Sequence, residues 1–221
     1  MATLASAIVD KAELILKDSS NGRWAAAELL DWLIEGEEVI VTLKPDANAT
    51  QESVVLSSGT LQSLPATATQ LLDVTYNMGL TPGTTYGDAI SLVDRGTMDA
   101  CYPGWQTEDS STTVKHVIYD PVKLPKKFWV YPQSPGTNYI QIVTAKIPGG
   151  IASLATNINL GDEYTTPLMD WVLFRAFQKD AEYNPSVERA LSHLDAFRQY
   201  LGIRDNMEDK MAPQSTQGGT A

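Results

Sequence analysis

Apolar and polar positions recur with different periods in three consecutive parts of the chain. In the first part, residues 4–17, apolar side chains follow one another at steps of four, four and three, and charged residues lie mostly between them. This spacing gives an α-helix one apolar stripe, so we predict an amphipathic helix that buries the stripe. The stripe consists of Leu4, Ile8, Ala12 and Ile15.

A second helix is predicted from about Ala25 to Leu43, because Pro45 cannot continue a helix interior. The connection between the first two helices is the short polar run 18–22. Since so short a turn keeps helices side by side, we expect the two to pack antiparallel. The apolar face of the second helix consists of Leu29, Leu30, Leu33, Ile40 and Leu43.

The middle of the chain has a period of two, which is typical of β-strands with one buried face. Clusters of Gly, Pro, Ser and Asn separate the alternating segments, and 57–59 is the best candidate for a hairpin turn. We predict a small antiparallel sheet or sandwich that contains a short helix at 95–101. The predicted strands are 52–56, 60–64, 71–77, 89–93, 113–119, 128–131 and 139–146.

The helical period returns at Thr166. Residues 167–182 are apolar on nearly all sides, which predicts a helix buried on more than one face. Asn184 and Pro185 favour the start of a last helix, with asparagine as N-cap and proline in the first turn, and Gly202 is its predicted C-cap. Helices at both ends therefore bracket a β-rich middle, which is an α+β organisation.

Charge and composition narrow the classes of function. The 221 residues carry a formal net charge of −11, so the chain lacks the excess of lysine and arginine that holds nucleic acid by its phosphates. We expect no specific DNA binding, although DNA can slide past such a surface without adhering. No apolar stretch is long enough to cross a membrane, and the first residues do not form a secretion signal, so we expect a chain that is made in a cytosol.

Side chains suited to catalysis or metal binding are few. Cys101 is the single cysteine and has no neighbouring histidine or base, so we interpret it as a small packing residue. The two histidines, His116 and His193, lie on different predicted elements, which argues against a zinc site. We expect both to be structural or exposed, and we predict no catalytic residue, no cofactor and no metal site.

The stretch 32–40, WLIEGEEVI, places a glycine among three glutamates inside the second helix. Glu35, Glu37 and Glu38 have no lysine, histidine or serine within a turn, so we interpret them as a solvated or interface face that tolerates glutamine. Glycine costs a helix interior about 1 kcal/mol relative to alanine. Gly36 therefore indicates that another element, most simply its backbone, approaches the helix closely.

A resemblance to a known family begins just before this stretch. Residues 23–36, RWAAAELLDWLIEG, resemble the R-W-x-x-x-E-L-L-x-W-L-x-E-G signature of head-to-tail adaptor proteins (connectors) of tailed bacteriophages, especially short-tailed ones. Members usually place Ser, Thr or Asp where this chain has Ala25, so the helix start should be weaker here by about 1 kcal/mol. The resemblance covers about residues 4–201 and continues in order through 59–65, 70–79, 93–105, 119–121, 128–132 and 174–183.

The resemblance implies a structural virion protein rather than an enzyme. It implies a helical bundle formed by 1–47 and 162–204, with the β-rich domain 48–161 inserted between them. Such adaptors form a ring, commonly of about twelve copies, that binds the portal protein on one side and the next tail component, a nozzle or tail tube protein, on the other. The ring extends the DNA channel, and the expected location is the neck or tail of a virion assembled in the host cytoplasm.

Two groups of residues are candidates for interfaces. Aromatic residues and a glycine on the helices are expected to fill the helix packing or the subunit interface. They are Trp24, Trp32, Gly36, Trp171, Phe174 and Phe177. The segment 205–221 is polar and without period, so we expect an extended C-terminal tail that the portal or an adjacent copy holds in place. The candidate contacts there are Met207, Met211, Pro213 and Gln214.

A second function is left open by the five tryptophans. They could belong to a receptor- or glycan-binding β module of a phage tail, which would gather exposed aromatic side chains on one loop face. In that case Trp105 would contact the glycan, and its replacement by alanine would abolish binding.

Overall fold

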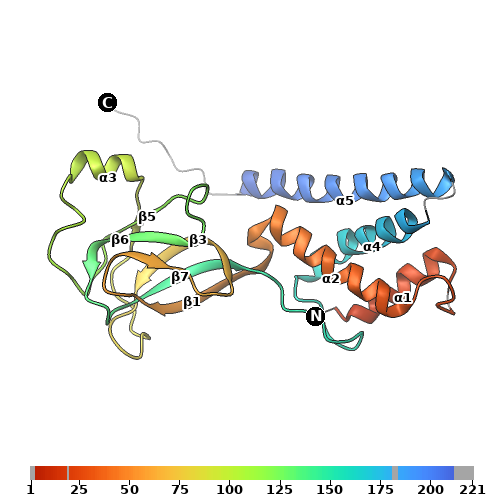
Figure 1. Ribbon diagram of the computed structural model, residues 1–221, viewed down its shortest axis with the longest axis horizontal. Helices are drawn as coiled ribbons and strands as arrows, with labels where there is room; N and C mark the ends of the chain where they lie inside the picture. Colours follow the sequence, from red (N-terminus) through yellow and green to blue (C-terminus); the bar gives the residue numbers. More distant parts are fainter. Residues whose placement is uncertain (1–2, 19, 181–183, 212–221) are drawn as a thin grey trace. The chain divides into compact units, whose positions relative to one another are not determined.

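The computed structural model describes residues 3–18, 20–180 and 184–211, with residues 184 and 203–211 described by their backbone alone. The chain divides into two compact units. Met1–Val39 and Gly149–Ala221 form the first, which we call the helical unit, and Ile40–Pro148 form the second, which we call the β unit. Helices from both ends of the chain flank a β-rich middle, so the predicted α+β class is confirmed (Figure 1).

The helical unit contains the helices predicted at the two ends of the chain. They are α1 (Ala5–Leu16), the greater part of α2 (Ala26–Leu43), α4 (Thr165–Lys179) and α5 (Asn184–Met211). A short 3-10 turn, η2 (Asp162–Tyr164), leads into α4. Both α1 and α5 pack on α4, which explains why the sequence of α4 is apolar on more than one side. Antiparallel packing of α1 against α2 stays a prediction.

Helix α1 buries a different arc from the one predicted. Ile8 and Ala12 are buried as expected, but Leu4 is 44 % and Ile15 48 % exposed. An α-helix turns about 100° per residue, so the stripe of four residues lies at the edge of the buried arc rather than at its centre. The buried residues are Ala5, Ile8, Val9 and Ala12.

Two further expectations about helix ends are wrong. Leu43, predicted on the apolar face of α2, is exposed at the end of that helix. Gly202 does not end the last helix, since α5 continues to Met211. A glycine costs a helix only about 1 kcal/mol, and the first proline after Gly202 is Pro213. The expected tail 205–221 thus begins as helix, and 212–221 lie outside the described residues.

The β unit holds two sheets with the strand orders β1-β7-β3 and β2-β6-β5-β4. All described pairs of strands are antiparallel except β4 and β5, which are parallel. A 3-10 turn, η1 (Pro45–Asn48), precedes the first strand, and the predicted short helix is α3 (Arg95–Cys101). The strands are β1 (Ala49–Val55), β2 (Gly59–Ser63), β3 (Ala68–Asn77), β4 (Ser91–Leu92), β5 (His116–Tyr119), β6 (Lys127–Ser134) and β7 (Tyr139–Lys146).

The expected hairpin at 57–59 does not form, because its flanking strands belong to different sheets. β1 pairs with β7, whereas β2 pairs with β6. The side chain of Gln62 fixes the corner between them: its Oε1 accepts from the N–H of Ser57 at 2.7 Å, and its Nε2 donates to the carbonyls of Ser57 and Gly59 at 2.8 and 3.0 Å. The two sheets share one apolar core, which is the sandwich alternative of the prediction.

Candidate functional site

The most specific packing in the helical unit is the contact between α2 and α4, which we call the α2–α4 seam. A Cβ atom on Gly36 would lie 2.9 Å from Cδ1 of Trp171 and 3.2 Å from Cδ2 of Leu168. Only glycine fits at this point without a shift of these neighbours. The close approach predicted from the sequence is therefore present, but a tryptophan ring approaches α2 rather than another backbone.

Trp171 connects the seam to α5. Its ring centroid lies 5.3 Å from that of Phe174 and 5.1 Å from that of Phe197. These tilted arrangements are favourable for aromatic pairs, and Phe197 is buried. Three of the residues singled out from the sequence, Gly36, Trp171 and Phe174, thus lie together, and α4 carries two of them.

Charged side chains border the α2–α4 seam. Lys179 Nζ lies 2.7 Å from Glu28 Oε2, and Arg175 Nε lies 3.1 Å from Glu35 Oε2. The half-buried Trp32 lines a shallow hollow together with residues from both helices. Partly exposed ion pairs contribute at most about 1 kcal/mol each, so they fix the register of the two helices more than they stabilise the unit.

Trp24 and the turn before α2 form the other end of the seam. The buried Trp24 donates from Nε1 to the carbonyl of Ala176 at 3.3 Å, and Arg23 pairs with Asp180. The carboxylate of Asp18 accepts from the N–H groups of Trp24, Arg23 and Gly22. These backbone hydrogen bonds, led by the one from Trp24, lower the pKa of Asp18. Its position in a polar turn was the only signal for this role in the sequence.

Glu37 corrects the interpretation of the acidic stretch. Its side chain is 0 % exposed, not solvated as expected. Oε1 accepts from the N–H of Asn159 at 2.7 Å and from that of Leu160 at 3.4 Å, and Oε2 accepts from Asn159 Nδ2 at 2.8 Å. Burial raises the pKa of Glu37, while the hydrogen bonds from Asn159 and Leu160 oppose this rise. Glu37 therefore anchors the segment before η2 to α2, a role with no sequence signal because its partner is 122 residues away.

Phe177 packs beside the histidine of α5. The ring of His193 stacks on Phe177 with centroids 5.8 Å apart, and Nδ1 of His193 lies 2.9 Å from Oδ1 of Asp170. The guanidinium group of Arg189 lies over the Phe177 ring, with its carbon 5.7 Å from the ring centroid. The structural role expected for His193 agrees with these contacts.

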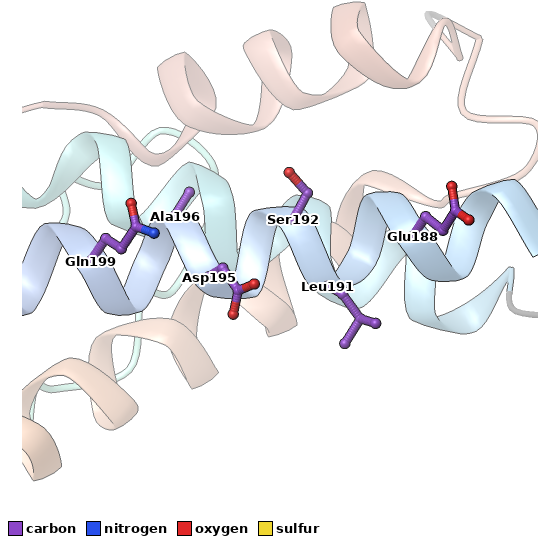
Figure 2. Close-up of a pocket in the computed structure, with 6 residues that line it drawn as sticks. All are labelled: Glu188, Leu191, Ser192, Asp195, Ala196 and Gln199. Carbon is purple, nitrogen blue, oxygen red and sulfur yellow. The ribbon is translucent and has the colours of Figure 1, made fainter.

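The outer side of α5 carries a shallow hollow along a single helix stripe (Figure 2). Leu191 is 55 % exposed within it. The six residues that line it are Glu188, Leu191, Ser192, Asp195, Ala196 and Gln199. Of the tail candidates, Met207 and Met211 lie within helix α5. Their side chains, and the whole of Pro213 and Gln214, lie outside what the structure describes.

The β unit contains three residues that were singled out from the sequence: Cys101, His116 and Trp105. Cys101 is exposed at the end of α3, so its predicted role in packing is wrong. The ring of His116 stacks on Tyr131, as expected of a structural histidine. Trp105, on which the glycan-binding alternative depends, is 1 % exposed, and its Nε1 donates to Asp99 Oδ1 at 2.9 Å. A tryptophan so enclosed offers no open face to a sugar.

Among the described residues, no three His, Cys, Asp or Glu side chains gather in a way that could hold a metal ion. Within the same ranges, no helix combines the length and the apolar character needed to span a bilayer.

The comparison with known proteins gives one family. The model of the SU10 adaptor protein family matches residues 3–217, which is nearly the whole chain. No curated protein matches the chain. The extent of the family match confirms the resemblance to phage head-to-tail adaptors, and the protein belongs to the SU10 adaptor protein family.

Proposed function

We propose that this protein forms a ring in the virion neck that joins the portal protein to the next tail component and extends the DNA channel. The observation that carries the proposal is the family match over residues 3–217. In this proposal the protein acts by recognition and not by catalysis, with no cofactor. The residues of the α2–α4 seam hold the shape of the helical unit that the neighbouring proteins recognise.

The net charge of −11 is compatible with such a ring. An acidic channel wall repels the phosphates of DNA, so DNA passes without being held. Repulsion between copies is limited, since the Debye length is about 8 Å at physiological salt. An interface of standard size, about 1,600 Å², is expected to outweigh it.

Assembly with the portal tests the proposal directly. Purified protein mixed with portal protein is expected to give a closed ring of about twelve copies on the portal, visible by electron microscopy and by native mass spectrometry. A protein that stays monomeric at all concentrations and never joins the portal would refute the proposal.

We further propose that the end of the chain, 205–221, binds the portal or an adjacent copy. The support is its polar composition without an apolar period, which gives it no core of its own to join. Ending the chain after Met211 keeps α5 complete. This truncation is expected to weaken attachment of the ring to the portal and to leave the melting temperature of the isolated protein unchanged. Attachment at full strength without 212–221 would exclude these ten residues as the contact.

A further inference from the structure

Helix α1 and its N-cap carry an exposed apolar surface outside the buried arc of the helix. Leu14 is 71 % exposed, and Leu4 and Ile15 are nearly half exposed. Lys11 is exposed and lies between Leu14 and Ile15 around the helix, and the exposed Asp10 borders Leu14 at the rim of this surface. An apolar strip with an ammonium group between its side chains can pack against a surface that offers an apolar side chain together with carboxylates.

The hollow on α5 is complementary to the α1 surface in charge and also exposes an apolar side chain. Leu191 lies between Glu188 and Asp195, which are one helical turn away on either side (Figure 2). The opposite side of α5 is occupied, since Ala190 and Phe197 are buried. The hollow therefore combines one exposed leucine with two carboxylates, where the surface of α1 combines exposed leucine and isoleucine side chains with one ammonium group.

Length and charge point to a second copy of this chain as the occupant. The 12 residues of α1 span about 18 Å, and the hollow extends over 11 residue steps of α5, about 17 Å. Each copy carries a formal net charge of −11, so a copy approaches Glu188 and Asp195 favourably only where it exposes a cation. The α1 surface offers such a cation, Lys11, between exposed apolar side chains on a helix of matching length.

We propose that the α1 surface of one copy docks into the α5 hollow of the next copy, with Leu14 and Ile15 against Leu191 and Lys11 between Glu188 and Asp195. Two different surfaces of the same unit then meet, and such a head-to-tail contact repeats around a ring. This inference rests on the proposed ring and identifies the surfaces that close it.

Charge exchange tests the contact, with ring formation measured by native mass spectrometry over a range of concentrations. Lys11→Glu and the double variant Glu188→Lys/Asp195→Lys are each expected to raise the concentration at half-assembly about tenfold or more. Combining the three substitutions is expected to restore assembly, because the charges again match across the interface. Lys115→Glu, an exposed lysine of the β unit, makes the same change of net charge and is expected to assemble as the wild type does.

The outcomes separate the contact from the ring itself. Folding of each variant is checked by its thermal melting curve, so that loss of assembly is not mistaken for unfolding. If wild-type rings form but Lys11→Glu assembles equally well, the proposed docking surfaces are wrong while the ring stands. The same conclusion follows if the folded triple variant assembles no better than the variants altered on one surface alone. If the wild type forms no ring, the proposed function itself fails.

Discussion

Replacement of Gly36 by leucine is expected to destabilise the helical unit by about 3 kcal/mol, near the upper end of the usual cost of overpacking. The first added carbon already falls 2.9 Å from the Trp171 ring, and three further carbons have to be accommodated in the same place. The gain in helix propensity on replacing glycine, about 1 kcal/mol, is too small to compensate. Denaturant unfolding followed by tryptophan fluorescence measures the loss, and ring assembly should fail with it.

The chain provides a matched control for this substitution. Gly202 also lies in a helix, but a Cβ there meets no atom within 4 Å. Gly202→Leu is therefore expected to be neutral or stabilising. A second check removes the obstructing ring: in the background of Trp171→Ala, Gly36→Leu should cost clearly less than it does alone. Equal costs in the two backgrounds would show that Trp171 is not what requires glycine at position 36.

Replacement of Glu37 by glutamine is expected to cost about 1 to 3 kcal/mol, although the two side chains have nearly the same shape. The carboxylate accepts three hydrogen bonds, one of them from Asn159 Nδ2. A glutamine amide can accept the two from the backbone with its oxygen, but its NH₂ group then faces the NH₂ group of Asn159. Asn159 cannot simply turn over, because its Nδ2 also donates to the carbonyl of Gly149.

The pKa of Glu37 adds a dependence on pH. Burial raises the pKa of the folded carboxyl above its usual 4.5, so the folded state takes up its proton more readily than the unfolded state. The stability from this difference is fully present below pH 4.5 and is lost as the pH rises through the raised folded value. The wild type should therefore lose stability relative to Glu37→Gln as the pH rises across this range.

Urea unfolding of the two proteins between about pH 4 and pH 7 measures this difference, and titration of all other groups cancels in it. Glu38→Gln is the control, because Glu38 is the next residue of the same helix and is exposed. Since it is exposed, its replacement is expected to change stability by at most about 1 kcal/mol over the same pH range. A constant difference between wild type and Glu37→Gln would mean that Glu37 titrates in the folded protein as it does in the unfolded chain.

Much of the fold could be predicted from the order of side chains. Helices α1, α2 and α4 and the strands from β1 to β7 lie within a few residues of the predicted positions, because periods of 3.6 and 2 reflect which side of an element is buried. The motif around Gly36, together with the later motifs in the same order, resembled the adaptor family, which the family match confirms. The same motif places glycine where a side chain of α4 comes close. That Gly36 is a packing position was also predictable, because glycine destabilises a helix interior and is expected there only where a larger side chain does not fit.

Other properties depended on partners that are far away along the chain. The sequence around 57–59 is compatible with a hairpin, but β1 and β2 each found a better partner in β7 and β6, so the turn became a corner between sheets. Local turn chemistry reports whether the chain can reverse, not which strand it then joins. For the same reason the arc of α1 that is buried was set by α4 and not by the apolar stripe alone.

The sequence by itself determined the element types, the α+β class and membership of the adaptor family, because all three follow from local periods and from the order of short motifs. Only the tertiary structure decided what individual side chains do. It buried Glu37 under Asn159, enclosed Trp105, exposed Cys101 and left the outer faces of α1 and α5 open. Burial depends on contacts between residues more than a hundred positions apart, as for Glu37 and Asn159, and no local pattern of polarity encodes such a contact.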